Sequence, residues 1–196
     1  MTHKLVLASS STYRAALLKR LGLEFQCTAP NIDETSLHNE GIDDYIERLS
    51  VAKAKAVAVT LKEPSIIIAS DQSATFEENI IGKPHTRQNA IEQLSAFSGK
   101  SVTFKTGVCV FNTLTSEYEY ERVDYSVTFR DLTLEDIANY VDKDSPLDCA
   151  GSFKSEKLGI ALFSSMSGDD PTALEGLPLI TTCKLLRNQG IDPLSI

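Results

Sequence analysis

The sequence predicts an α/β fold with a mixed central sheet flanked by helices. Short apolar runs that suit strands alternate with longer segments of helical periodicity, as in other α/β chains. Two alternating runs, 101–112 and 118–129, follow each other closely and predict an antiparallel hairpin, so the sheet is expected to be mixed. The 196 residues, 42% of them hydrophobic, suffice for one sizeable core in two lobes.

The first half of the chain predicts three strands and two helices. Each predicted strand is a short run rich in apolar residues, and each predicted helix repeats apolar residues at a helical spacing. Ser11 or Thr12 can cap the first helix. The predicted strands cover 5–8, 24–28 and 65–72, and the predicted helices cover 13–21 and 43–61.

The second half adds the hairpin and three further helices. Thr86 and Thr133 stand where N-caps are expected, and acidic residues follow Thr133 in the first turn of its helix. The residues between these helices predict loops and one short strand. The predicted helices cover 86–97, 134–141 and 177–189, and the short strand covers 160–164.

The charge and hydropathy of the chain exclude two classes of partner. The net charge is −8 and no basic stripe is present, so nucleic-acid binding is not expected. No stretch approaches the roughly 18 apolar residues that a membrane helix needs, and the apolar run at the start is too short for a signal peptide. We therefore expect a cytoplasmic protein without a membrane partner.

Missing motifs narrow the chemistry further. The four cysteines lie far apart without a CxxC pair, so we expect free thiols rather than a zinc cluster. The sequence has no GxSxG elbow and no Walker A loop. The serines near the start are therefore better explained as binding residues than as nucleophiles.

The stretch "LASSSTYR" is the first candidate site. A strand that enters a helix through small polar residues exposes backbone N–H groups at the positive end of the helix dipole. Arg14, at the start of this helix, could bind a phosphate through two parallel hydrogen bonds. The alternative is a capped helix that carries a surface arginine.

Two further segments carry candidate residues for phosphate chemistry. Asp71 follows an apolar strand, where open α/β sheets place ligands, and could hold a cation or accept a proton from water. Lys83 lies between Gly82 and Pro84, which would fix the turn and so the lysine as a phosphate partner. The alternatives are a turn-capping aspartate and a solvated lysine. Glu34 and Lys53 are weaker candidates when each is taken alone.

Short motifs spread along the chain together resemble the Maf-like nucleotide pyrophosphatases. They occur in order and nearly end to end: "LASSSTYR", "DE", "AKA", "SDQ", "GKP", "TGV", "CAGSFKSE" and "GLPL". The resemblance implies a metal-dependent hydrolase that cuts a nucleoside triphosphate into a monophosphate and pyrophosphate. It also implies a Maf/ITPase-like fold, with two lobes around a cleft in a single domain over 1–196, and it leaves a homodimer open.

The resemblance also assigns roles by position. Asp71 matches the catalytic base of the family, and Ser9 matches its polar turn. Glu34 matches a carboxylate that would hold Mg²⁺ or Mn²⁺ together with Asp71. The cationic phosphate ligands of the family match Arg14, Lys53 and Lys83.

Three positions indicate the branch of the family that acts on 7-methyl-GTP: Tyr13, Gln72 and Glu156. N7-methylguanine carries a positive charge, which the face of Tyr13 could attract. The carboxylate of Glu156 could accept both N1–H and N2–H of guanine. Tyr13 stands where tryptophan is common, and Thr12, Ala15 and Ala52 also depart from common residues of the branch.

Two alternative functions remain open at this point. One is the dTTP/UTP pyrophosphatase activity of the same family, which a carboxylate at Glu156 disfavours because uracil and thymine offer fewer donors. The other is a protein that regulates division by sensing nucleotides without hydrolysing them. That reading predicts loss of Asp71 or Lys83, and both residues are present.

Overall fold

The structure is a computed structural model that describes residues 4–77 and 79–195. Among the described residues, seven strands form one mixed sheet in the order β2-β1-β3-β5-β6-β7, with β4 paired to β3. The strands are β1 (Lys4–Leu7), β2 (Gln26–Cys27), β3 (Ser65–Phe76), β4 (Asn79–Ile81), β5 (Ser101–Asn112), β6 (Glu117–Phe129) and β7 (Phe163–Gly168). This mixed α/β architecture confirms the predicted fold class.

The helices alternate with these strands along the chain, as the sequence predicts. Their N-caps include Ser11, Thr86 and Thr133, each of which accepts a hydrogen bond from a backbone N–H of the first turn. The α-helices are α1 (Thr12–Lys19), α2 (Ile42–Ala58), α3 (Arg87–Phe97), α4 (Leu134–Asp144) and α5 (Leu179–Asn188). Short 3₁₀ helices are η1 (Ala150–Ser152), η2 (Leu158–Leu162) and η3 (Pro171–Glu175).

The chain divides into two compact units. The first comprises 4–72, 106–123 and 170–195, and the second comprises 73–105 and 124–169, apart from residue 78. The three longest strands contribute residues to both units. Each unit has its own packing and is described separately.

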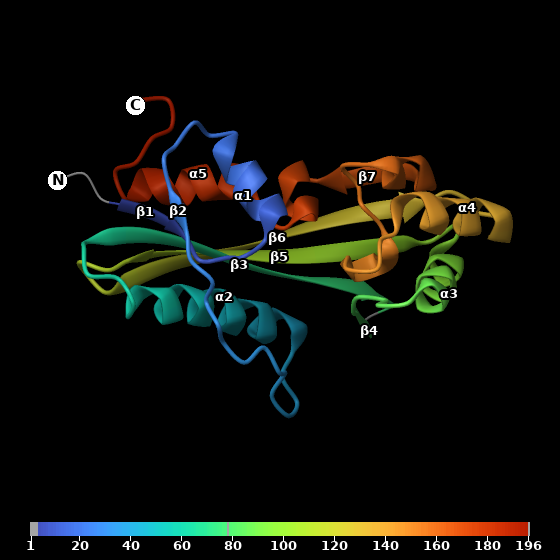
Figure 1. The fold of residues 1–196 in the computed structure, drawn as a ribbon, viewed down its shortest axis with the longest axis horizontal. Coiled ribbons are helices and arrows are strands. Elements are labelled where there is room, and N and C mark those ends of the chain that lie inside the picture. Colours follow the sequence, from blue (N-terminus) through green and yellow to red (C-terminus); the bar gives the residue numbers. More distant parts are fainter. Residues whose placement is uncertain (1–3, 78, 196) are drawn as a thin grey trace. The chain divides into compact units, whose positions relative to one another are not determined.

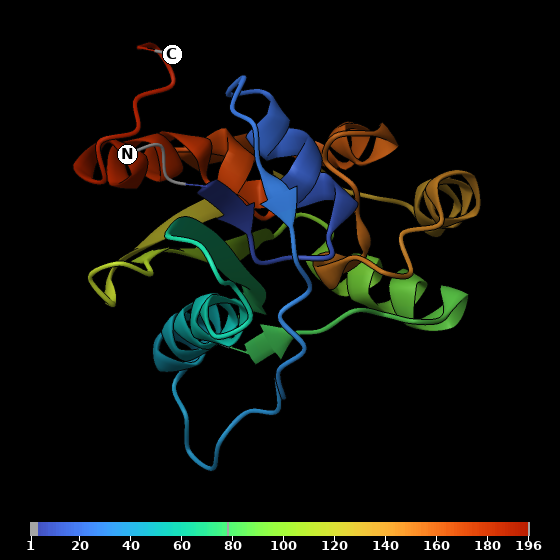
Figure 2. The same ribbon diagram turned by 60° about the vertical axis from the view of Figure 1, so that its left-hand side comes forward.

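In the first unit, helices cover both faces of the parallel strands β1, β2 and β3 (Figures 1 and 2). Figure 1 shows α1 and α5 above these strands and α2 below them. Because side chains alternate along a strand, Leu5, Leu7, Ile66 and Ile68 pack in the cluster with α1 and α5. Their neighbours along the strands, Val6, Ala8, Ile67 and Ala69, pack in the cluster with α2.

In the second unit, an aromatic cluster forms much of the core. Phe97 of α3 contacts Phe76 and Phe129, with ring centroids 4.9 and 5.5 Å apart. Phe153 contacts both Phe129 and Phe163 in edge-to-face geometry, which suits the quadrupoles of the rings. Helices α3 and α4 of this unit pack against each other.

Two sequence predictions of strands need correction, and one observed strand was not predicted. The strand predicted at 65–72 continues to Phe76, so Asp71 does not lie at a strand end. The strand predicted at 160–164 is wrong, because η2 occupies 158–162 and β7 begins at Phe163. The short strand β4 was not predicted; it has three residues, too few to show a period of two.

Among the described residues, no helix is both long enough and apolar enough to cross a membrane. The longest α-helix, α2, has 17 residues and includes charged ones.

Burial in the first unit yields a prediction for stability. Leu18 on α1 is fully buried, whereas Leu134 at the start of α4 is 71% exposed. We expect Leu18→Ala to lower the free energy of unfolding by about 2–5 kcal/mol, through lost burial and a cavity. Leu134→Ala, the same chemical change, should stay within about 0.5 kcal/mol of the parent. Urea denaturation measures both, and equal losses would contradict the assignment of this core.

Candidate functional site

A buried ammonium group lies at the centre of the candidate site. Lys53 of α2 is only 5% exposed, and its Nζ lies 2.6 Å from Asp71 Oδ1 and 2.9 Å from Glu34 Oε1. Asp71 belongs to β3 and is also buried, whereas the carboxylate of Glu34 is about half exposed. The structure thus brings together three residues that the sequence places far apart.

The periodicities of α2 and β3 explain how Lys53 and Asp71 meet. Lys53 lies on the face of α2 that also carries Leu49, Ser50 and Val57, all of them buried. Asp71 lies two and four residues beyond Ala69 and Ile67, so it continues the face of β3 that packs against α2. The hydroxyl of Ser50 adds a further link by accepting a hydrogen bond from the backbone N–H of Asp71 at 3.1 Å.

The loop that carries Glu34 is held by two other side chains of α2. The hydroxyl of Tyr45 donates to the backbone carbonyl of Glu34 at 2.9 Å. Arg48 donates to the carbonyl of Thr35 at 3.1 Å and forms a two-point contact with the carboxylate of Glu40. The hydrogen bond from Arg48 lowers the pKa of Glu40 to about 2, so this clamp persists at neutral pH. These contacts fix the backbone at Glu34 and at the residue that follows it.

Arg14 joins the same electrostatic environment from α1. Burial lowers the pKa of its guanidinium, and the charges of Asp71 and Glu34 act in the opposite direction. Its Nε donates to the carbonyl of Gly176 at 2.8 Å. With Nε engaged, the two terminal nitrogens are the groups left to bind an anion in the predicted two-point mode.

The serine turn uses part of its own hydrogen-bonding capacity. Ser9 is 5% exposed, and its hydroxyl accepts a hydrogen bond from the backbone N–H of Ser11. The hydroxyl of Ser11 in turn accepts from the backbone N–H of Arg14. These two N–H groups therefore stabilise the turn itself. A contact of Ser9 with a ligand stays a prediction.

Gly176 connects Arg14 to β3. Its carbonyl accepts from both Arg14 Nε and the hydroxyl of Ser70, each at 2.8 Å. Gly176 has φ of +97°, and a Cβ at this position would lie 3.3 Å from Arg14 Nε. A side chain there would therefore strain the backbone and crowd the arginine.

Gln72 lies on the same face of β3 as Ser70. Its amide nitrogen donates to the carbonyls of Ala173 and Leu174 at 2.6 and 3.3 Å, and to the hydroxyl of Thr106 at 3.0 Å. These acceptors fix which way the amide is turned, because a carboxamide oxygen cannot donate to a carbonyl. The oxygen of Gln72 is then the atom available to accept a hydrogen bond from a ligand.

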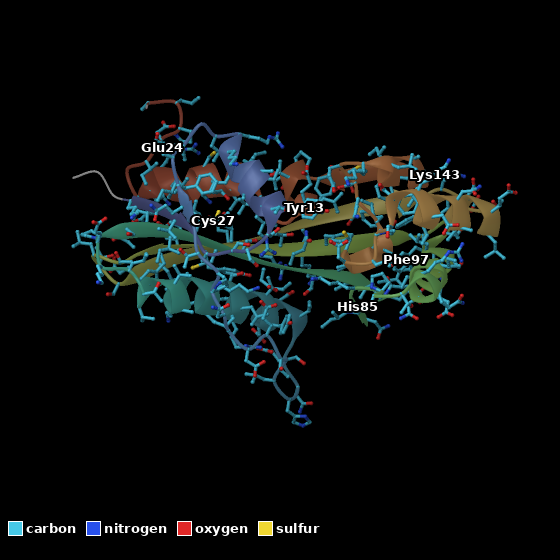
Figure 3. The ribbon with its side chains drawn as sticks, in the orientation of Figure 1. Tyr13, Glu24, Cys27, His85, Phe97 and Lys143 are labelled. Carbon is cyan, nitrogen blue, oxygen red and sulfur yellow. The ribbon has the colours of Figure 1, made fainter. Side chains whose placement is uncertain are left out.

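Tyr13 is next to Arg14 at the start of α1 and is partly exposed (Figure 3). It completes the set of predicted site residues that lie in the first unit. That set is Ser9, Tyr13, Arg14, Glu34, Lys53, Asp71 and Gln72.

The other two predicted residues, Lys83 and Glu156, lie in the second unit. Both are exposed. Two side chains of α3 hold the backbone on either side of Lys83, because Gln93 donates to the carbonyl of Gly82 and Asn89 to that of Pro84. The participation of Lys83 and Glu156 in the candidate site stays a prediction from the sequence.

Several residues that build this site were not predicted as part of it. Arg48 and Tyr45 hold the Glu34 loop, and Ser50 and Thr106 hold β3 residues. Gly107 allows this packing, because a Cβ there would lie 2.8 Å from the hydroxyl of Ser50. Buried polar residues on an otherwise apolar helix face, such as Ser50 beside Lys53, are the signal that could have found some of them.

The two carboxylates beside Lys53 are the predicted ligands of a divalent metal ion. Among the described residues, no group of three or more histidine, cysteine, aspartate or glutamate side chains is placed to hold a metal ion. Asp71 and Glu34 do converge on one cation, the ammonium of Lys53. Mg²⁺ commonly binds one or two protein carboxylates and takes its other oxygen ligands from substrate phosphates and water, so this donor set fits such an ion.

The ion pair at the centre of the site yields a second stability prediction. In Lys53→Met, the carboxylate of Asp71 stays buried without its cation, which should lower the free energy of unfolding by about 3 kcal/mol. Adding Asp71→Asn removes the uncompensated charge and should restore part of that loss. Urea midpoints of the single and double variants measure this coupling. A double variant that is less stable than Lys53→Met would contradict the pairing.

Comparison with known proteins adds independent findings. A family model described as Maf-like protein matches residues 4–189. A protein of Idiomarina loihiensis named 7-methyl-GTP pyrophosphatase is 48% identical over 196 residues, which cover 100% of this chain and 99% of the relative. A protein of the same name from Hydrogenovibrio crunogenus is 51% identical over 191 residues, covering 96% of this chain and 94% of its own.

Among solved structures, a HAM1 protein from Coxiella burnetii aligns with 95% of this chain and 100% of its own length. The TM-score is 0.52 and the sequence identity is 17%. At this identity the likeness concerns the fold alone, and it agrees with the predicted ITPase-like architecture.

Proposed function

The chain belongs to the Maf-like protein family, and on this basis we propose that it hydrolyses a nucleoside triphosphate to the monophosphate and pyrophosphate. We propose 7-methyl-GTP as the substrate, because the relatives from Idiomarina loihiensis and Hydrogenovibrio crunogenus carry the name 7-methyl-GTP pyrophosphatase. The observation that carries the reaction type is the buried contact of Lys53 with Asp71 and Glu34, in the electrostatic range of Arg14.

The proposed chemistry assigns Asp71 as the base. Lys53 binds its Oδ1 at 2.6 Å, which leaves Oδ2 to accept a proton. A water molecule attacks the α-phosphorus, Asp71 takes the proton of that water, and the bond from the α-phosphorus to the bridging oxygen breaks. Pyrophosphate leaves with the electron pair of that bond.

The cations bind and orient the triphosphate. The terminal nitrogens of Arg14 suit two phosphate oxygens, while its Nε keeps the guanidinium fixed on Gly176. Lys53 places a positive charge within the buried part of the site, where electrostatic attraction is strong. Lys83 is proposed as a further phosphate ligand from the sequence alone.

A divalent cation, Mg²⁺ or Mn²⁺, is proposed as the cofactor, with Asp71 and Glu34 as its protein ligands. When bound, it would supply positive charge that stabilises the phosphate oxygens during hydrolysis. The Tyr45 and Arg48 contacts hold the Glu34 backbone where the carboxylate can serve this purpose.

Selectivity for the nucleobase of the substrate is assigned to three side chains. Tyr13 offers an aromatic face to the cationic ring of 7-methylguanine. Gln72 offers its amide oxygen, because its nitrogen is engaged by backbone carbonyls. For Glu156 we propose, from the sequence alone, acceptance of the guanine N1–H and N2–H donors. A cytoplasmic location and a homodimer also remain proposals.

Replacement of Asp71, the proposed catalytic base, tests the proposed reaction. We expect Asp71→Asn to lower the rate of pyrophosphate release about 10²–10⁴-fold, the usual contribution of a positioned base. Asp142→Asn is the matched control, because Asp142 forms an exposed ion pair with Arg87 in the second unit. Circular dichroism checks that both variants fold. Full activity of a folded Asp71→Asn variant would exclude Asp71 as the base.

A nucleotide panel tests the substrate. Pyrophosphate release from 7-methyl-GTP, GTP, UTP, dTTP and CTP is measured with Mg²⁺ and with Mn²⁺. We expect preference for 7-methyl-GTP, and a loss of about tenfold or more in kcat/KM for it in Glu156→Gln, since hydrogen bonds to a charged group contribute about 1.5–3 kcal/mol.

The other outcomes of the panel separate the alternatives. Preference for UTP or dTTP would favour the other pyrophosphatase activity of the family and would contradict 7-methylguanine as the nucleobase of the substrate. Release from none of the nucleotides would favour a protein that senses nucleotides without hydrolysing them.

A further inference from the structure

Asp170 is a buried carboxylate without an assigned role in the reaction. It is 1% exposed and caps the start of η3. Its Oδ1 accepts from the backbone N–H and the hydroxyl of Thr172 at 3.1 and 2.6 Å. Its Oδ2 accepts from the backbone N–H groups of Ile180 and Thr181 at 2.7 and 3.4 Å. One side chain therefore joins η3 to the first turn of α5.

The first turn of α5 depends on this contact. Its N-cap is Pro178, which makes no side-chain capping bond. The first N–H groups of a helix have no partner within the helix, and leaving them buried and unpaired is costly. Asp170 and Thr172 supply the missing acceptors, because the hydroxyl of Thr172 also accepts from the N–H of Leu179 at 2.7 Å. Hydrogen bonds thus join the first residues of segment 170–179 to its last residues, which makes it a closed loop.

The backbone carbonyls of this closed segment hold two residues of the candidate site. Ala173 and Leu174 accept from the amide nitrogen of Gln72, and Gly176 accepts from Nε of Arg14. Within the described residues, Asp170 forms no hydrogen bond with Gln72 or Arg14. Any influence of Asp170 on these side chains therefore passes through the segment.

We propose that Asp170 is a positioning residue that sets the placement of Arg14 and Gln72 through these three backbone carbonyls of segment 170–179. Arg14 then binds the triphosphate, and Gln72 binds the nucleobase. This part of the inference rests on the proposed function. Asparagine cannot replace Asp170, because every partner of the carboxylate is a donor and an amide nitrogen would face an N–H on one side. The hydrogen bonds to one of the two carboxylate oxygens would therefore be lost.

The test compares Asp170→Asn with Asp169→Asn, the same change at the exposed neighbouring residue. kcat and KM are measured for 7-methyl-GTP and GTP, at a temperature at which circular dichroism shows all variants folded. We expect Asp170→Asn to lower kcat/KM for 7-methyl-GTP about tenfold or more, as for the loss of a charge-assisted contact. Its preference for 7-methyl-GTP over GTP should also narrow. Asp169→Asn should match the parent.

A second pair of variants and a double variant separate positioning from folding. Thr172→Val keeps the shape of the side chain and removes the hydroxyl, so it should act in the same direction as Asp170→Asn. Thr172→Ser keeps the hydroxyl and should retain the parental constants. In a Gln72→Ala background, Asp170→Asn should no longer change the preference between the two nucleotides. If Asp170→Asn and Thr172→Val lower Tm but leave both kinetic constants unchanged, the contact is structural only and the proposal is wrong.

A measurement without substrate decides the matter independently of the proposed function. Hydrogen exchange of the Arg14 Nε–H, observed by NMR, should be slow in the parent because Gly176 accepts this hydrogen. It should become faster in Asp170→Asn and stay slow in Asp169→Asn. Unchanged exchange in Asp170→Asn overturns the positioning role. Absence of pyrophosphate release from the parent would instead overturn the proposed function.

Discussion

The burial of the Lys53 ammonium is the constraint on which the candidate site depends. An ammonium group removed from water is strongly destabilised unless opposite charges and hydrogen bonds replace its hydration. Asp71 and Glu34 provide these charges, and each needs its own support. Ser50 fixes the backbone of Asp71, and the Arg48 and Tyr45 contacts fix the loop of Glu34. Three polar side chains of α2 thus support the two carboxylates that face this buried charge.

Strand β3 divides the site between its two faces. Asp71 lies on the face toward α2, whereas Ser70 and Gln72 lie on the face whose apolar residues pack with α1 and α5. Three consecutive residues can therefore serve two sets of contacts: an ion pair on one side and the carbonyls of 173–176 on the other. A shift of register by one residue would exchange these faces and remove both sets.

The sequence predicted those features that leave a local pattern. The helices and their caps at Ser11, Thr86 and Thr133 follow from periodicity and capping chemistry, and β5 has the predicted bounds. Lys53 and Glu34 were only weak candidates from the residues alone, since nothing local to either shows that they meet. The roles of the Ala173, Leu174 and Gly176 carbonyls could not be predicted, because every residue carries a carbonyl and only the folded backbone selects which ones accept a hydrogen bond.

The charges of the first unit explain why an acidic chain is compatible with an anionic substrate. Arg14 and Lys53 contribute two positive charges to the site, and Asp71 and Glu34 contribute two carboxylates. This set is close to neutral, and salt screens the more distant carboxylates of a chain with net charge −8. A triphosphate brings several further negative charges, which the two cations already shared with carboxylates cannot balance. A divalent cation held by Asp71 and Glu34 would supply that balance, and this requirement links the proposed cofactor to the pairing of Lys53.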